Sequence, residues 1–175
     1  MSEGKKEVIY SSLEYGYYKP ESTQFDSDGA GETYDICDKL GSNITNYHLK
    51  KINYILNANQ YIDLIKLQYI KKTDGTTESM ETPTWEGLND KPEEYIIDDD
   101  EEIKNVKIYL KEMRLIGFEI TTNKGKNKKI GYGEENEVNK EINFEEGGKT
   151  VVGFGFNASK KYGVYSMHFY YVDKN

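Results

Sequence analysis

No nucleophile–base pair and no metal-ligand spacing is visible in the sequence of this chain of 175 residues. His48 and His168 are the only histidines, and they lie far apart without a serine or cysteine pattern that would complete a catalytic triad or a zinc site. We interpret both histidines as structural or exposed. Cys37 lies in Y-D-I-C-D, where acidic neighbours raise the pKa of the thiol and make it a poor nucleophile. The sequence therefore predicts a protein that is not an enzyme.

Two acidic stretches could hold a hard cation such as Ca²⁺, but each lacks part of the required pattern. The run from Asp98 to Glu102 lacks the alternating spacing and the glycine of a calcium loop. Residues 26–29, D-S-D-G, are closer to such a loop, but no glutamate stands at the distance that would complete it. Solvated turns are the favoured interpretation of both stretches. The phosphate-binding motif G-x-x-x-x-G-K-[ST] does not occur, and we predict no cofactor.

The charge balance is acidic and argues against polyanionic partners. Lys and Arg number 23, Asp and Glu number 31, and the net charge is −8. Such a chain has no electrostatic reason to bind nucleic acid or anionic lipid. A single cysteine cannot form an internal disulfide, which fits a reducing compartment or a secreted fold that needs none. No apolar run is long enough for a membrane span or a signal peptide, so we expect a cytoplasmic protein, or one secreted without a visible signal peptide.

Short segments with a period of two dominate the chain from about residue 47 onward, and they predict strands. In residues 65–69 the apolar side chains alternate with Lys66 and Gln68, and a D-G turn follows at residues 74–75. Residues 106–110 and 167–171 alternate in the same way. Residues 39–50 would hold one helical turn at most. The 16 tyrosines and 6 phenylalanines supply apolar area for a core. An all-β sandwich, barrel or prism is therefore predicted, with a weak internal three-fold repeat.

Residues 116–133, I-G-F-E-I-T-T-N-K-G-K-N-K-K-I-G-Y-G, contain a hairpin signal, because a strand stops at N-K-G and restarts before a second glycine. This string resembles the middle repeat of the jacalin-like (mannose-binding-type) lectin family, "L-x-F-x-T-N-K-G … G-x-F-G". Residues 47–75 resemble the family's first repeat, residues 94–133 its second, and residues 150–172, T-V-V-G-F-G-F-N-A-S-K-K-Y-G-V-Y-S-M-H-F-Y-Y-V, its closing segment. The three stretches occur in the family's order.

The resemblance implies an all-β fold, the β-prism I, with three four-stranded antiparallel sheets around a pseudo-three-fold axis. Residues 1–35 would form an N-terminal extension with the first loop and strand, and residues 36–175 the prism domain. In this family the sugar site lies at one end of the prism, between a glycine-rich N-terminal loop and the loop before the last strand. There an aspartate accepts hydrogen bonds from sugar hydroxyls, and nearby backbone N–H groups donate others.

The chain departs from the family pattern at both of these loops. The family's aspartate falls on Tyr165, which carries no charge at neutral pH, and its preceding glycine falls on Lys161, although Gly163 could serve in a shifted loop. Residues 16–26 replace the glycine-rich loop. The candidate ligand-binding residues that the resemblance implies are Phe25, Asp26, Gly155, Phe156, Asn157, Lys161, Tyr162, Gly163 and Tyr165.

Two functions remain open from the sequence. The first is a non-enzymatic, carbohydrate-binding, lectin-like module with a departed sugar site, whose partner is a glycan or glycoprotein. The alternative is a structural or protein-interaction subunit of a larger assembly that kept the prism and lost the sugar. Protein partners and oligomerisation are compatible with both, and neither needs nucleic acid or a membrane span.

Overall fold

The structure is a computed structural model and describes residues 8–16, 32–83, 90–134, 139–160 and 162–174. Almost all of its regular elements are strands, as the period-two pattern predicts. In chain order the elements are β1 (Ile9–Ser11), β2 (Glu32–Asp35), α1 (Ile36–Leu40), the 3₁₀ helix η1 (Gly41–Asn46), β3 (Tyr47–Leu56), β4 (Ile62–Lys71), β5 (Thr77–Glu81), β6 (Glu93–Ile96), β7 (Ile103–Lys111), β8 (Arg114–Thr122), β9 (Asn127–Gly131), β10 (Lys140–Asn143), β11 (Lys149–Ser159) and β12 (Gly163–Asp173).

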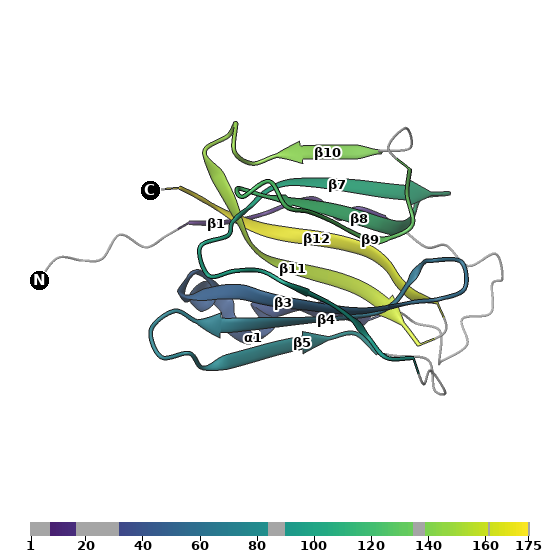
Figure 1. The fold of residues 1–175 in the computed structure, drawn as a ribbon, viewed down its shortest axis with the longest axis horizontal. Helices are drawn as coiled ribbons and strands as arrows, with labels where there is room; N and C mark the ends of the chain where they lie inside the picture. Colours follow the sequence, from purple (N-terminus) through teal and green to yellow (C-terminus); the bar gives the residue numbers. More distant parts are fainter. Residues whose placement is uncertain (1–7, 17–31, 84–89, 135–138, 161, 175) are drawn as a thin grey trace, which may run out of the picture.

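Three four-stranded antiparallel sheets pack around a common core and form a β-prism (Figure 1). Sheet I has the strand order β1-β12-β11-β2, sheet II the order β10-β7-β8-β9, and sheet III the order β5-β4-β3-β6. Each sheet has a long hairpin at its centre, formed by β11–β12, β7–β8 and β3–β4 respectively. The β-prism I prediction, with its pseudo-three-fold arrangement, is confirmed.

The core lies between the inner faces of the three sheets, where alternate residues of the central strands meet. Phe118 from sheet II packs against Phe154 and Phe156 from sheet I, with ring centroids 6.2 and 6.0 Å apart. Sheet III contributes Tyr69, whose hydroxyl accepts a hydrogen bond from the Phe154 backbone N–H at 3.3 Å. Aromatic pairs at these separations add favourable ring contacts to the hydrophobic gain from burial. All three sheets therefore pack against one shared core.

The predicted hairpin at residues 116–133 is present, and the predicted helical content is nearly right. The Gly125 N–H donates to the Thr122 carbonyl in the turn between β8 and β9. The helical turn lies at α1 and η1, slightly earlier than residues 39–50. Asp35 caps α1, since its carboxylate accepts a hydrogen bond from the Cys37 N–H at 2.7 Å. Within the described ranges, no helix has the length and apolarity needed to cross a membrane.

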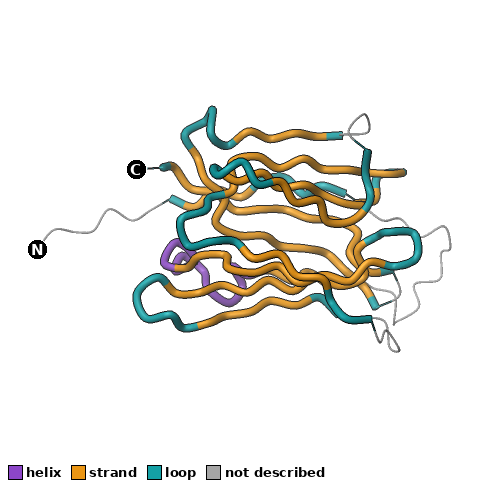
Figure 2. Tube along the Cα trace, in the orientation of Figure 1, coloured by secondary structure: helices purple, strands orange, loops and turns teal. Residues whose placement is uncertain are grey.

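The described part of the predicted N-terminal extension belongs to sheet I. Strand β1 pairs with β12, with Ile9 opposite Val172, and β2 pairs with β11, with Asp35 opposite Gly155. Residues 12–16, which we call the N-terminal segment, continue along β12, because Tyr15 and Met167 exchange both backbone hydrogen bonds. Among the described strands, β1 and β2 follow one another in the sequence but form the two opposite edges of sheet I. Figure 2 shows how strands dominate the described chain, with helix confined to one small region.

Candidate functional site

The three central hairpins reverse direction at one end of the prism, on the right in Figure 1. We call this the turn end. It comprises the β3–β4 turn (residues 57–61), the β7–β8 turn (residues 112–113) and the described residues 160 and 162 of the β11–β12 turn. The three hairpins have strands of similar length and place their turns in one layer, so residues far apart in sequence can face the same ligand here. The loop before the last strand, which the sequence predicts as part of the sugar site, lies in this layer.

Arg114, the only arginine of the chain, joins all three turns. It begins β8, and its guanidinium donates a hydrogen bond to the Tyr162 carbonyl in the β11–β12 turn. The same guanidinium lies over the Tyr61 ring of the β3–β4 turn, 5.2 Å from the ring centroid. A planar cation that both donates and stacks can fix two partners in one geometry. Arg114 therefore gives the turn end a defined shape.

Asp63 places a carboxylate at the turn end, beside the β11–β12 turn. It lies on β4 directly against Gly163, where an added Cβ would stand 3.1 Å from an Asp63 oxygen and 2.5 Å from the Ile62 carbonyl. Burial raises the pKa of Asp63 above its usual range, while a hydrogen bond from Asn57 and the charge of Arg114 oppose that shift. The side chain is half-buried. Asp63 was not among the residues that the family resemblance selected.

The structure separates the three site residues predicted on β11. Phe156 is fully buried and points into the core, so its side chain does not face a ligand. Gly155 lies on the opposite face, under the His168 ring. Asn157 is on this same outer face, where its amide donates to Ser166 Oγ at 2.7 Å. The side chains of the predicted β11 residues therefore do not form one binding surface.

The predicted residues of the β11–β12 turn and early β12 remain together. Tyr162 is half-buried in the turn, and its N–H donates to Ser159 Oγ at 3.1 Å. Gly163 has a φ of +68°, which glycine adopts without strain. Tyr165 is half-buried at a bulge of the β11–β12 pairing, and burial followed by the nearby charge of Glu14 raises its pKa. Phe25, Asp26 and Lys161 lie outside the described residues.

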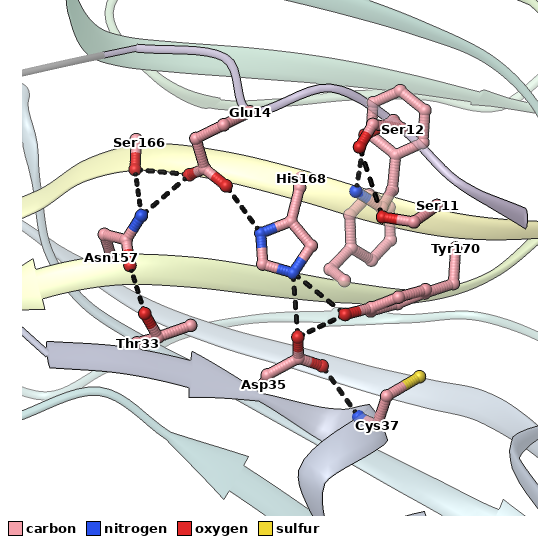
Figure 3. Close-up of polar contacts among 12 residues, drawn as sticks. Ser11, Ser12, Glu14, Thr33, Asp35, Cys37, Asn157, Ser166, His168 and Tyr170 are labelled. Carbon is pink, nitrogen blue, oxygen red and sulfur yellow. Dashed lines mark hydrogen bonds and ion pairs between the residues drawn. The ribbon is translucent and has the colours of Figure 1, made fainter. Parts of the chain in front are cut away.

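A polar cluster around the buried His168 and Ser166, on the outer face of sheet I, is the main feature that sequence reasoning missed (Figure 3). His168 Nδ1 lies 2.8 Å from a Glu14 carboxylate oxygen, and Nε2 lies 2.8 Å from an Asp35 carboxylate oxygen. Tyr170 donates its hydroxyl hydrogen bond to Asp35 as well. Both ring nitrogens thus face carboxylates, which leaves neither of them positioned as a general base for a substrate. The interpretation of His168 as a structural residue fits this geometry.

The electrostatics of the cluster keep His168 charged at neutral pH. Burial disfavours the imidazolium, but the hydrogen bonds and charges of Asp35 and Glu14 outweigh burial and raise its pKa to about 9. Burial likewise disfavours the Asp35 carboxylate, yet hydrogen bonds from His168, Tyr170 and the Cys37 N–H hold its pKa below the usual value. The cluster is therefore an imidazolium between two carboxylates.

The free energy of unfolding should depend on pH through this cluster. Because the pKa of His168 is raised on folding, its contribution is complete below its ordinary pKa of 6.5 and is lost as pH rises through about 9. The shift alone corresponds to about 3 kcal/mol at 1.36 kcal/mol per pKa unit, and because the Glu14 side chain is exposed, solvent screening should reduce the contribution to about 1–2 kcal/mol. That of Asp35, whose pKa is lowered, is lost as pH falls below 3.8. Urea unfolding at pH 6, 7.5 and 9 measures this loss below the pH at which the buried and half-buried tyrosines, whose pKa values are also raised, begin to contribute, and His168→Gln should show little of it.

The acidic run from Asp98 to Glu102 forms ion pairs with lysines. Lys126 contacts both Asp98 and Glu101, at 2.9 and 3.0 Å, and Lys50 lies 2.8 Å from Asp99. Glu101 is buried, and one of its oxygens accepts a hydrogen bond from the Asp98 N–H at 2.7 Å. The run is thus a lysine-paired turn, and no group of His, Cys, Asp and Glu among the described residues is arranged to hold a metal ion.

Comparison with solved structures finds the same fold in plant lectins. The wild-type Malaysian banana lectin matches with a TM-score of 0.62 and 16% identity, over 96% of this chain and 100% of that chain. The Calsepa lectin in complex with a biantennary N-glycan matches with a TM-score of 0.61 and 16% identity, over 95% and 98%. A mannose-binding jacalin-related lectin from Ananas comosus matches with a TM-score of 0.58 and 16% identity, over 94% and 98%.

Because these sequence identities are low, the structural matches show a shared fold and nothing more. Among curated protein sequences, none matches the chain. A family model for the jacalin-like lectin domain, however, matches residues 13–174, which include every described strand except β1. With the β-prism and the match over this length, the chain belongs to the jacalin-like lectin domain family.

Proposed function

We propose that this chain is a non-enzymatic carbohydrate-binding module that binds glycans at the turn end, through a site that departs from the family pattern. The observation that carries the proposal is Asp63, a half-buried carboxylate packed against Gly163 beside the β11–β12 turn. Sugar hydroxyls need a fixed acceptor, and a charged acceptor makes the stronger hydrogen bond. Asp63 would supply at this end the charge that Tyr165 lacks.

The neighbouring groups would complete the site in separate roles. The Tyr162 ring would stack on the C–H face of a sugar, as aromatic rings do with apolar surfaces that carry polar edges. The Tyr165 hydroxyl would donate or accept one further hydrogen bond. Arg114 would not contact the sugar, because its guanidinium is engaged with the Tyr162 carbonyl and the Tyr61 ring. Its role would be to position the turns.

Mannose-containing N-glycans are the first ligands to test. The Ananas comosus lectin is described as mannose-binding, and the Calsepa lectin was crystallised with a biantennary N-glycan. We carry this ligand class over to the present chain as part of the proposal. Because the acidic run is paired with lysines, we expect EDTA to leave binding on a glycan array unchanged.

Asp63→Asn should weaken glycan binding about ten-fold or more, because the change removes the charge of the acceptor and keeps its shape. Titration calorimetry or surface plasmon resonance with the best array ligand measures the effect. Asp74→Asn is the matched control, since Asp74 follows the other end of the same strand β4 and pairs with Lys71 there. Equal affinities for wild type and Asp63→Asn would refute the role of Asp63.

Tyr162→Ala combined with Tyr165→Ala tests the aromatic part of the site. If binding persists in this double variant and in Asp63→Asn, the ligand does not bind at the turn end. A blank array for the wild-type chain would instead favour the alternative, a structural or protein-interaction subunit. What favours this alternative is Tyr165, an uncharged, half-buried residue at the position where the resemblance would place the family's aspartate.

A further inference from the structure

Side chains of the described residues connect the two edges of sheet I. Strands β1 and β2 are consecutive in the sequence, yet β12 and β11 lie between them in the sheet. Backbone hydrogen bonds join each edge strand only to its immediate neighbour. Among the described residues, a side-chain link between the segment before residue 17 and the segment after residue 31 therefore crosses β12 and β11 on a face of the sheet.

Two polar bridges make this crossing, and both start at Glu14 (Figure 3). One Glu14 oxygen lies 2.8 Å from His168 Nδ1, and His168 Nε2 lies 2.8 Å from Asp35 on β2. The other Glu14 oxygen accepts from Asn157 Nδ2 at 2.9 Å, and the Asn157 carbonyl oxygen accepts from the Thr33 hydroxyl at 2.6 Å. Glu14 is thus tied twice to β2, through one side chain of β12 and one of β11.

The His168 ring can cross β11 only where that strand has a glycine. Gly155 stands opposite both Asp35 and His168, and a Cβ at that position would come within 2.3 Å of the imidazole ring. The bare glycine backbone lets the ring extend across β11 and reach the next strand. A residue with a side chain at this position would keep the two carboxylates from sharing one imidazole.

We propose that His168 is a positioning residue that locks the N-terminal segment, residues 12–16, onto sheet I by pairing with Glu14 and Asp35 at once, and that this lock maintains the glycan affinity of the turn end. The effect on glycan affinity rests on the proposed function. The contact that would carry it is at Ser166, which adjoins Tyr165 and whose hydroxyl donates a hydrogen bond to Glu14. The locking of the N-terminal segment onto sheet I is argued from the contacts of the polar cluster alone.

Charge makes the lock strong and sensitive to pH. The groups that face His168 are Glu14 from the N-terminal segment, Asp35 from β2 and the Tyr170 hydroxyl from its own strand, while β11 presents only Gly155. The Asp38 charge of α1 acts more remotely, on Tyr170 and Cys37. A neutral imidazole carries one N–H and can donate to one carboxylate only. Loss of the proton therefore opens one side of the lock.

Hydrogen exchange of two amides reports directly on the lock. The Ser12 N–H donates to the Phe169 carbonyl and the Tyr15 N–H to the Met167 carbonyl, at 2.8 and 2.7 Å. In His168→Gln, we expect the protection factors of these two amides to fall ten-fold or more. Those of the β7–β8 hairpin, which report global unfolding, should fall by no more than the loss of unfolding free energy that urea measures for the same variant. His48→Gln is the matched control, because it makes the same change at the other histidine, which lies on β3.

The pH profile separates a lock from general loosening. In wild type the protection factors of Ser12 and Tyr15 should drop as pH passes the titration of His168, followed by the ¹⁵N shifts of its ring, and His168→Gln should show no such step. This titration also tests the proposal if the variant does not fold. Unchanged protection in His168→Gln, or ring nitrogens that titrate at the ordinary pH of a free histidine, would overturn the lock.

Glycan affinity tests whether the lock maintains binding at the turn end. If wild type binds a glycan, His168→Gln should bind it at least five-fold more weakly, and the wild-type affinity should drop over the same pH step. Lost protection with unchanged affinity would overturn the link to the turn end. If wild type binds no glycan, the proposed function fails and the link to the turn end fails with it, while hydrogen exchange still decides the lock.

Discussion

Phe156→Ala should lower the free energy of unfolding by about 3–5 kcal/mol, the range for removing a buried aromatic side chain from a packed core. Phe156 has no exposed surface, and its ring lies 6.0 Å from Phe118 and 6.3 Å from Phe154. Its removal opens a cavity where sheets I and II meet, and neighbours on β-strands cannot move far enough to fill it. Urea or thermal unfolding, followed by circular dichroism, measures the loss.

Phe156→Leu is the control for this substitution. It keeps most of the apolar volume and should cost about 1–2 kcal/mol. This milder variant should also retain full glycan affinity, because the side chain faces the core. A loss of affinity in folded Phe156→Leu would show that the residue acts at the ligand site, as the family resemblance predicts. A stability loss below about 1 kcal/mol in Phe156→Ala would contradict its place in the core.

Gly155→Ala should cost about 3 kcal/mol or more, although it adds only one methyl group. The new Cβ would lie 2.3 Å from two ring atoms of His168 and 3.2 Å from the Asp35 carboxyl carbon, so the imidazolium must leave its place between the carboxylates. Separating one member of a buried ion pair from its partner costs about 3–5 kcal/mol, because a charge is left uncompensated. Chemical denaturation at pH 7 is the measurement.

Gly147→Ala makes the same change where space is open, since the nearest atom to a Cβ there lies 3.7 Å away. It should be neutral or stabilise the fold by up to about 1 kcal/mol. A second test is coupling. In a His168→Ala background the added methyl group meets no ring, so Gly155→Ala should then cost less than about 1 kcal/mol. Additive losses in the double variant would contradict the steric explanation.

The strands and turns could be predicted because their signals are local. Alternation along residues 65–69 and the turn at Asn123 to Gly125 each depend on a few adjacent residues, and both are present in the structure. The family resemblance gave the arrangement of the sheets in the same way, since each matching stretch corresponds to a local hairpin. The inward direction of Phe156 was also within reach, because it alternates with Phe154 on one face of a strand.

The polar cluster could not be predicted from local signals. His168 bonds to Glu14 and Asp35, which are 154 and 133 positions away in the sequence. The only local hint was that Ser166, His168 and Tyr170 share the polar face of the last strand. Asp63 could not be predicted as a site residue for a similar reason, because only the packing of β4 against Gly163 places Asp63 at the turn end. These contacts exist only once the sheets are assembled.

The split composition of sheet I has a consequence for folding during synthesis. Sheet III is built from strands within residues 47–96 and sheet II from strands within residues 103–143, so each has all of its strands in one stretch of chain. Sheet I takes its edges from residues 9–35 and its centre from residues 149–173. On the ribosome, β1 and β2 emerge first but have no partners until β11 and β12 follow. Such long-range strand pairing is slow, so we expect β1 and β2 to pair last, although they are synthesised before the other strands of the prism.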